Sequence, residues 1–202
     1  MLSISDFFLT DNKTKILSKW KIEGYKKKPL LITGTKGNGK TCLSEVILKD
    51  YKIININIDF IKQKVDLKQY LDMSIGKKNI SMMFKSKNTQ LYKAIVFDDI
   101  EIIVKEDKSL FKNILEFLKY MDIYKNNLII FILDEKNSCK NMFSPFVKVS
   151  DIINIKYDKK TFYKIANNIF KKEKIFFSME NITNIIHKST NNINNLKANI
   201  DF

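Results

Sequence analysis

The chain has no arginine. All 36 basic side chains among its 202 residues are lysines, so it cannot supply an arginine finger, the guanidinium group that stabilises the transferred phosphate in many phosphoryl-transfer enzymes. Small nucleotide kinases typically clamp phosphates with arginines, and the composition therefore argues against that class. Rapid phosphoryl transfer by this chain would need a catalytic cation from a lysine or from a partner protein.

Cysteine and histidine are scarce as well. Cys42 and Cys139 are the only cysteines, too few for a disulfide framework, and we expect both to be thiols in a reducing compartment. The single histidine, His187, cannot build a histidine-rich metal site without a cysteine cluster to help it. The sequence therefore predicts no zinc site.

Long apolar segments are missing too. No apolar stretch approaches the roughly 20 residues that a helix needs to cross a bilayer, and Met1 to Thr10 lack the basic start of a secretory signal. We therefore expect a soluble, intracellular protein without a membrane partner.

Glycine is rare, yet it is concentrated in one segment that fits the pattern G-x-x-x-x-G-K-[ST] and follows the apolar run Leu30–Ile32. A strand before this pattern and a helix after it indicate a phosphate-binding loop, or Walker A motif, in which backbone N–H groups and the helix dipole surround an anion. Lys40 is expected to reach the β- and γ-phosphates of ATP, and the Thr41 hydroxyl to bind Mg²⁺. The predicted nucleotide-binding residues are Gly34, Thr35, Lys36, Gly37, Asn38, Gly39, Lys40, Thr41 and Cys42.

A second motif supplies acidic groups. The apolar run Ala94–Phe97 ends in Asp98 and Asp99, and an acidic residue at such a strand end, the Walker B position, can hold Mg²⁺. We predict Asp98 as metal ligand and, with Asp99, as catalytic residue. Many ATPases have Glu where Asp99 stands, a side chain longer by about 1.5 Å, so hydrolysis is expected to be slow. Glu101 is an alternative if the turn bends inward.

Strands and helices alternate along most of the chain, which predicts an α/β fold with a parallel sheet of about five strands, helices on both faces and ligands at the carboxyl ends of the strands. From Lys159 onward only helical periodicity remains. The expected domains are an ATPase core, residues 1–157, and a small all-helical lid, 158–202. We predict strands at 30–32, 54–58, 94–97, 128–133 and 152–155 and helices at 11–25, 41–50, 59–71 and 107–121, and leave 75–90 unassigned.

In the order of these motifs the chain resembles the AAA+ ATPases, and within them the large subunit of replication factor C, the clamp loader. The resemblance covers residues 13–202 and rests, besides the two motifs, on Ile16–Trp20, Pro29–Thr33, Tyr51–Asn57, Leu128–Asn137 and Thr190–Leu196. It implies ATP and Mg²⁺ as cofactors. As partners it implies other clamp-loader subunits, a sliding clamp and primer-template DNA, and as compartment the nucleus or a site of viral or cytoplasmic DNA replication.

Two positions depart from the family pattern. Asp134 stands where the resemblance places the sensor 1 asparagine, and Asn194 where it places the sensor 2 arginine. A carboxylate at sensor 1 and an amide at sensor 2 cannot neutralise phosphate charge. Both positions therefore favour nucleotide binding over rapid turnover.

The formal net charge of +14 favours a polyanionic partner such as DNA, because lysines that neutralise phosphates release counterions. The same lysines also fit an ordinary solvated surface, or the codon bias of an AT-rich genome.

Three functions stay open. The chain is a clamp-loader-like ATPase, an ATP-binding scaffold with negligible turnover, or a replication initiator or helicase loader, a group that often has Asp-Asp after the Walker B strand, as in Asp98–Asp99.

Overall fold

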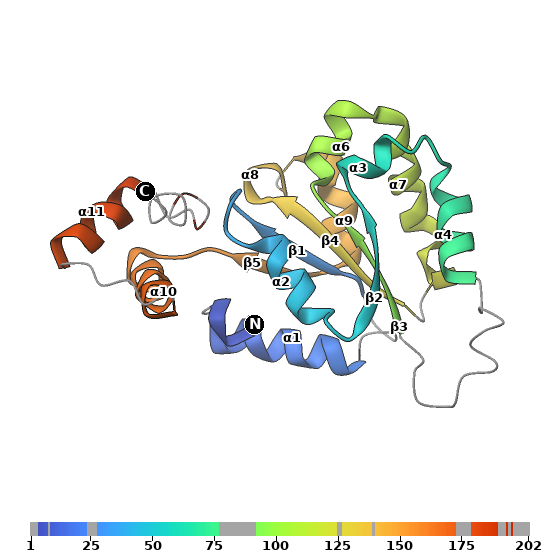
Figure 1. Cartoon of the computed structure of the whole chain (residues 1–202). Helices are drawn as coiled ribbons and strands as arrows, with labels where there is room; N and C mark the ends of the chain where they lie inside the picture. The colour runs from blue at the N-terminus through green and yellow to red at the C-terminus, as the bar shows by residue number, and fades with distance from the viewer. Residues whose placement is uncertain are drawn as a thin grey trace.

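Five parallel strands form the centre of the computed structural model (Figure 1), which describes residues 4–7, 9–23, 28–76, 92–124, 127–138, 140–172, 179–189, 193 and 195. Their order in the sheet is β2-β3-β4-β1-β5, and every neighbouring pair is parallel. This confirms the predicted α/β class and the five strands. The strands are β1 (Leu30–Gly34), β2 (Tyr51–Ile56), β3 (Tyr92–Phe97), β4 (Leu128–Asp134) and β5 (Asp151–Ile155).

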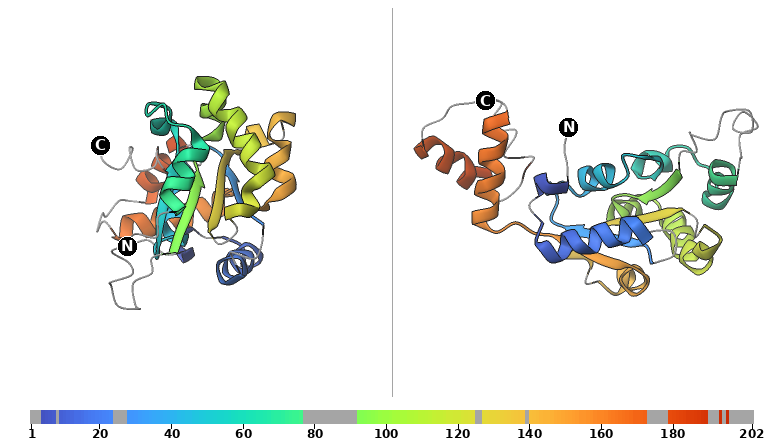
Figure 2. Two further views of the ribbon diagram at one scale, coloured as in Figure 1. Left: turned by 90° about the vertical axis from the view of Figure 1, so that its right-hand side faces the viewer. Right: turned by 90° about the horizontal axis from the view of Figure 1, so that it is seen from below.

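Helices connect the strands and cover both faces of the sheet (Figures 1 and 2). The α-helices are α1 (Asp11–Glu23), α2 (Lys40–Ile47), α3 (Ile58–Ile61), α4 (Leu67–Gly76), α6 (Ile100–Glu106), α7 (Lys108–Tyr120), α8 (Glu135–Ser138), α9 (Ser144–Val149), α10 (Lys159–Lys172) and α11 (Met179–Ser189), and the 3-10 turns are η1 (Ile4–Phe7), η3 (Met121–Tyr124) and η4 (Asn141–Phe143). None of the described helices is long and apolar enough to span a membrane.

The prediction for the second strand needs a correction. β2 begins at Tyr51 and ends at Ile56, whereas the alternation of isoleucines predicted a strand over 54–58. The Asn57 side chain accepts hydrogen bonds from the backbone N–H groups of Asp59 and Phe60, which is the geometry of a helix N-cap. Ile58 therefore starts α3 instead of ending the strand.

The side chains of the strands alternate between two apolar clusters. Leu30, Ile130 and Ile153 lie in the cluster under α1 and α2, whereas Leu31 and Phe131 lie in the cluster under α4, α6, α7 and α9. Because successive residues of a strand point to opposite faces, strands buried on both sides are nearly continuous apolar runs. This explains why β1, β3 and β4 could be located from the sequence.

Helices α10 and α11 lie beyond the carboxyl end of β5, at one end of the sheet (Figures 1 and 2). Buried side chains of α10, among them Phe162 and Ile165, belong to the same apolar cluster as the sheet residues Ile153 and Ile155. The described part of this region, α10 and α11, is helical, as expected. Its separation from the core at residue 157 stays a prediction.

Strand β5 forms one edge of the sheet, and helix α1 contacts it. The Lys13 ammonium donates a hydrogen bond of 2.6 Å to the backbone carbonyl of Asn154. The Asn154 side chain donates in turn to the Glu135 carboxylate at 3.1 Å. Polar contacts thus tie α1 and the turn after β4 to the edge strand.

Candidate nucleotide-binding site

The predicted phosphate-binding loop joins the end of β1 to the start of α2. Gly37 and Gly39 have φ angles of 85° and 80°, a left-handed conformation that glycine adopts without a steric penalty. Phe7, from η1, would lie 3.3 Å from a Cβ atom added at Gly39. The glycines of the motif thus lie where the backbone turns tightly, and Phe7 packs against this turn at Gly39.

Lys40 is the first residue of α2, and only 7% of it is exposed. Its ammonium donates hydrogen bonds to the carbonyl oxygens of Gly34, at 3.0 Å, and Thr35, at 3.2 Å. The positive charge is therefore held within the turn of the loop instead of in solvent. This position suits an ammonium that meets the phosphates of a nucleotide.

Asp98 lies directly after β3, where its carboxylate meets the start of α2. Its Oδ2 atom accepts a hydrogen bond of 2.9 Å from the Thr41 hydroxyl, and its Oδ1 atom accepts one of 2.8 Å from the backbone N–H of Asp99. Burial, and then the charge of Asp99, raise the pKa of the Asp98 carboxyl above its ordinary value. The structure therefore brings together the two residues predicted as metal ligands.

The oxygen groups here have the chemistry that Mg²⁺ requires. Carboxylate and hydroxyl oxygens are its usual protein ligands, and a divalent cation would offset the burial of the Asp98 charge. A cavity of about 240 Å³ adjoins them. Thr41 and Asp98 therefore fit a magnesium ion. The cavity is lined by Thr41, Ser44, Glu45, Ile53, Asn55, Val96 and Asp98.

Asp99, the other predicted catalytic residue, has a left-handed backbone, with φ 49° and ψ 44°, and marks the start of α6. This conformation is uncommon for residues other than glycine, and Asp is among those that adopt it most readily. The sharp turn begins α6 immediately after the strand. It also brings Glu101 to the first turn of that helix.

Asp134, the predicted sensor 1 residue, ends β4 and pairs in register with Gly34 of β1. Its Oδ1 atom accepts a hydrogen bond of 2.8 Å from the backbone N–H of Lys136, so the side chain stabilises the turn into α8. Asp134 thus lies beside Gly34, the last residue of β1, and its carboxylate is engaged by the next turn. Its sensor 1 role stays a prediction.

Three contacts to the loop were not foreseen from the sequence. Asn38 donates from its side chain to the Ile155 carbonyl at 3.4 Å, and the Tyr157 hydroxyl donates to the Asn38 carbonyl at 3.4 Å. The backbone N–H of Ile193 donates to the Gly37 carbonyl at 3.2 Å. Their partners are more than 100 residues apart in sequence, so no local pattern could have revealed them. Asn194 and Cys139 lie outside the described residues.

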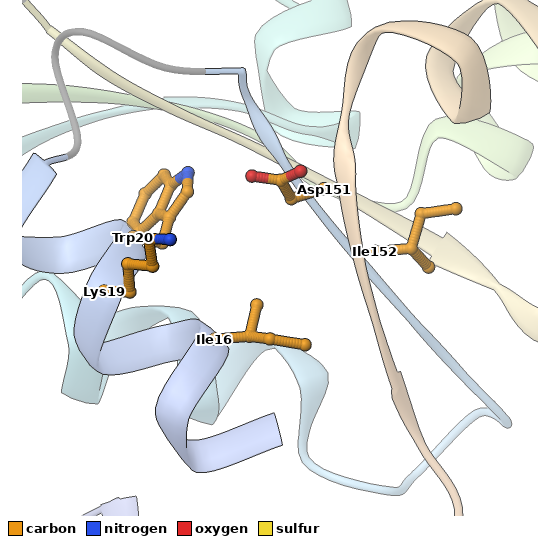
Figure 3. A pocket seen from close by; sticks show the side chains of 5 residues that line it. All are labelled: Ile16, Lys19, Trp20, Asp151 and Ile152. Carbon is orange, nitrogen blue, oxygen red and sulfur yellow. The ribbon is translucent and has the colours of Figure 1, made fainter. Parts of the chain in front are cut away.

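A larger pocket, of about 290 Å³, lies between α1 and β5 and is separate from the loop (Figure 3). Ile16, Lys19 and Trp20 face it from α1, and Asp151 and Ile152 from β5. It contains no glycine-rich turn and no hydroxyl–carboxylate pair. We therefore place the nucleotide at the loop and not in this pocket.

The family description "ATPase family associated with various cellular activities (AAA)" matches residues 30–136, which is more than half of the chain. The chain belongs to the AAA family. Membership implies that it binds ATP, and the match spans both the phosphate-binding loop and the acidic strand end. A search of curated proteins gives no match.

Solved structures show the same fold. AMPPCP-bound DnaA from Aquifex aeolicus has a TM-score of 0.65 at 17% identity, over 95% of this chain and 60% of that one. Domain III of the Thermotoga maritima replication initiation protein DnaA has a TM-score of 0.65 at 16% identity, over 97% of this chain and 84% of that one. The Thermotoga maritima RuvB Holliday junction branch migration motor has a TM-score of 0.65 at 15% identity, over 96% of this chain and 61% of that one.

Identities this low support the fold alone. The AAA chain spans about three fifths of the solved Aquifex aeolicus DnaA and Thermotoga maritima RuvB chains that it matches. These structures are a replication initiator and a branch migration motor. They give no specific support for the resemblance to the large subunit of replication factor C. That resemblance stays a prediction from the sequence motifs.

The close approach of β1 to β5 gives a testable expectation for Gly34→Ala. An added Cβ atom would lie 2.6 Å from the Ile155 carbonyl oxygen, a backbone atom that cannot move alone. We expect the free energy of unfolding to fall by about 1–3 kcal/mol, measured by urea denaturation. Thr35→Ala, which adds no atom to the same loop, should stay within about 0.5 kcal/mol of the wild type. Equal stability of the two variants would contradict this packing.

Proposed function

We propose that this AAA protein is an ATP- and Mg²⁺-dependent switch in DNA replication, of the initiator or helicase-loader type. One observation carries the proposal. At the start of α2 the buried Lys40 ammonium lies next to Thr41, whose hydroxyl donates a hydrogen bond to Asp98. The likeness in fold to DnaA supports the initiator type over the clamp loader. The pair Asp98–Asp99 supports it from the sequence.

In this proposal each residue of the site has a distinct task. Backbone N–H groups of the segment 35–41 would surround the phosphates, with Lys40 neutralising their charge. Thr41 and Asp98 would hold Mg²⁺, which would neutralise phosphate oxygens during the reaction. Asp99 would orient a water molecule. Cys42, exposed on α2, would contribute its backbone N–H only.

We propose slow turnover for the isolated chain. Asp99 is shorter than the glutamate that many ATPases have at this position, and Asp134 uses a carboxylate oxygen to stabilise the turn into α8. No arginine exists to act as a finger. A nucleotide that stays bound for long is what a switch needs, because the ATP-bound conformation must outlast the assembly step.

We also propose that residues 158–202 act as the lid over the nucleotide, with Asn194 at the sensor 2 position. The hydrogen bonds from Tyr157 to Asn38 and from Ile193 to Gly37 support this assignment. They connect the segment after β5, and the backbone near the C-terminus, to the phosphate-binding loop. A change in the loop would therefore be transmitted to this region.

The proposal predicts ATP-dependent binding of single-stranded DNA, as one solved structure similar in fold shows DnaA bound to AMPPCP and single-stranded DNA. A fluorescent oligonucleotide should bind about tenfold more tightly with AMPPCP and Mg²⁺ than without, within the usual range of coupling between two sites. Fluorescence anisotropy measures this. The affinity should also fall steeply with salt.

Asp98→Asn, which removes the charge and keeps the shape, should abolish the gain in DNA affinity from the nucleotide while leaving nucleotide-independent binding intact. DNA affinity that does not change with nucleotide in the wild type would refute the initiator type. Recovery of a sliding clamp with the tagged protein would instead favour the clamp loader, the alternative that the sequence motifs support.

A further inference from the structure

Asp98 is held in place by three hydrogen bonds, and one of them comes from a strand that neither motif contains. Its carboxylate accepts from the Thr41 hydroxyl and from the backbone N–H of Asp99. Its own backbone N–H donates a bond of 2.9 Å to the carbonyl of Ile56, the last residue of β2. Since β3 ends at Phe97, this bond extends the pairing of β2 with β3 up to the proposed metal ligand.

The direction of the Ile56 carbonyl depends on the residue that follows it. The carbonyl of Ile56 and the backbone nitrogen of Asn57 belong to one planar peptide group. This carbonyl therefore cannot rotate unless the backbone of Asn57 rotates with it. The register of β2 with β3 ends at the pair of Ile56 and Phe97, so a contact other than the strand pairing must fix the backbone at Asn57.

The Asn57 side chain supplies that contact. Its Oδ1 atom accepts from the backbone N–H groups of Asp59, at 3.0 Å, and Phe60, at 3.3 Å. The backbone of Asn57 is extended, with φ −131° and ψ −168°, as expected at a helix N-cap. The two bonds restrict both of these angles. The peptide group that holds Asp98 is thereby attached to the first turn of α3.

Helix α3 is a firm point of attachment. Only 2% of Phe60 is exposed, and this side chain belongs to the same apolar cluster as Ile56 and Phe97. Its ring meets that of Tyr70 edge to face, with 4.9 Å between the centroids. Helix α3 also contacts α6, the helix that starts directly after Asp99. The cap thus joins the support of Asp98 to a buried part of the fold.

We propose that Asn57 is a positioning residue of the nucleotide site, which fixes the metal ligand Asp98 through the Ile56 carbonyl. Its role is to keep the Asp98 carboxylate beside the Thr41 hydroxyl, so that both oxygens meet the same Mg²⁺ ion. The inference rests on the proposed ATP- and Mg²⁺-dependent function. It gives a task at the site to the junction between β2 and α3.

The first test measures binding of a fluorescent ATP analogue in EDTA and in Mg²⁺, and its readout is the ratio of the two affinities. In Asn57→Ala, the affinity in EDTA should match the wild type, because the phosphate-binding loop is unchanged. The ratio should fall about 10-fold, the lower end of the usual loss when a group that orients a metal ligand is removed. A variant that merely destabilised the fold would lose affinity under both conditions and keep the ratio.

Asp107→Ala is the matched control, because Asp107 caps α7 in the same way. Its Oδ1 atom accepts from the backbone N–H groups of Ser109 and Leu110, both at 2.9 Å. Loss of either cap should lower the urea midpoint to a similar extent, yet Asp107→Ala should keep the wild-type affinity ratio. Asn57→Ser should retain most of that ratio, because serine caps a helix about as well as asparagine.

Hydrogen exchange of the Asp98 backbone amide, followed by NMR without nucleotide, tests the geometry directly. The bond to the Ile56 carbonyl protects this N–H, and the protection reflects how rarely the bond opens. Exchange should be about 3- to 10-fold faster in Asn57→Ala than in the wild type. In Asp107→Ala it should stay at the wild-type rate.

The inference is overturned if Asn57→Ala and Asp107→Ala give the same affinity ratio, or if the Asp98 amide exchanges equally fast in both. A ratio in Asn57→Ser as low as in Asn57→Ala would also overturn it. Should the alanine variant not fold, Asn57→Gly replaces it, because glycine at an N-cap destabilises less and equally lacks the acceptor. Failure of the proposed function would look different. The wild type would then bind the analogue no better in Mg²⁺ than in EDTA, while the difference in exchange at Asp98 would remain.

Discussion

Lys40→Ala is expected to weaken ATP binding at least about 100-fold, equivalent to about 2.7 kcal/mol. The Lys40 ammonium is held by the carbonyls of Gly34 and Thr35 inside the loop, where contacts to phosphate are shielded from water. Hydrogen bonds to charged groups contribute about 1.5–3 kcal/mol each, and the variant also removes a full charge. Titration with a fluorescent ATP analogue measures the change.

The matched control for this experiment is Lys36→Ala, which removes the same charge from an exposed position of the same loop. Its effect should be below about threefold, because exposed charges are screened. Circular dichroism of both variants checks that the loop change leaves the fold intact. Equal losses of affinity in the two variants would mean that the nucleotide is bound by nonspecific electrostatic attraction and not by the buried Lys40 ammonium.

Trp20→Ala should lower the free energy of unfolding by about 3–5 kcal/mol. Only 2% of Trp20 is exposed, in the cluster under α1, and its indole N–H donates to the Lys28 carbonyl at 3.0 Å. The variant leaves a cavity and an unpaired carbonyl. Since natural domains have a total stability of about 5–15 kcal/mol, a large part of the fold's stability depends on this side chain.

Trp20 is the only tryptophan of the chain, so the variant has no tryptophan fluorescence with which to follow unfolding. Urea denaturation followed by far-ultraviolet circular dichroism is therefore the suitable measurement. Trp20→Phe should cost less, since it keeps the ring contacts and loses one hydrogen bond. Ile22→Ala, on the same helix with Ile22 80% exposed, should change stability by less than about 0.5 kcal/mol. A loss as large in Ile22→Ala, where alanine has the higher helix propensity, would contradict the expectation that burial decides the cost.

The parts of the site that follow from local spacing were predictable. The loop pattern and the apolar runs before Gly34 and Asp98 are continuous in sequence, so their chemistry and their place at strand ends could be inferred together. β2 was located less well because it is an edge strand whose residues Lys52, Ile53 and Asn55 are exposed. Exposure on one side weakens the apolar signal that marks a buried strand.

The parts that depend on register were not predictable. Strand β4 extends beyond the end of β3, and neither sequence pattern nor spacing fixes how far. Asp134 was expected to offer its side chain to the nucleotide region, yet the following turn engages that side chain. The partner that decides this is the backbone N–H of Lys136, a group that every residue except proline has, so residue identity carried no information.

The contact between Lys13 and the Asn154 carbonyl has a consequence for how copies of this protein can associate. An edge strand presents backbone groups that a strand from another molecule can pair with, and a lysine placed there opposes such pairing. The backbone carbonyl of Asn154 already accepts a hydrogen bond from Lys13 of the protein's own helix α1. Growth of the sheet from one molecule into the next is thereby hindered at the β5 edge.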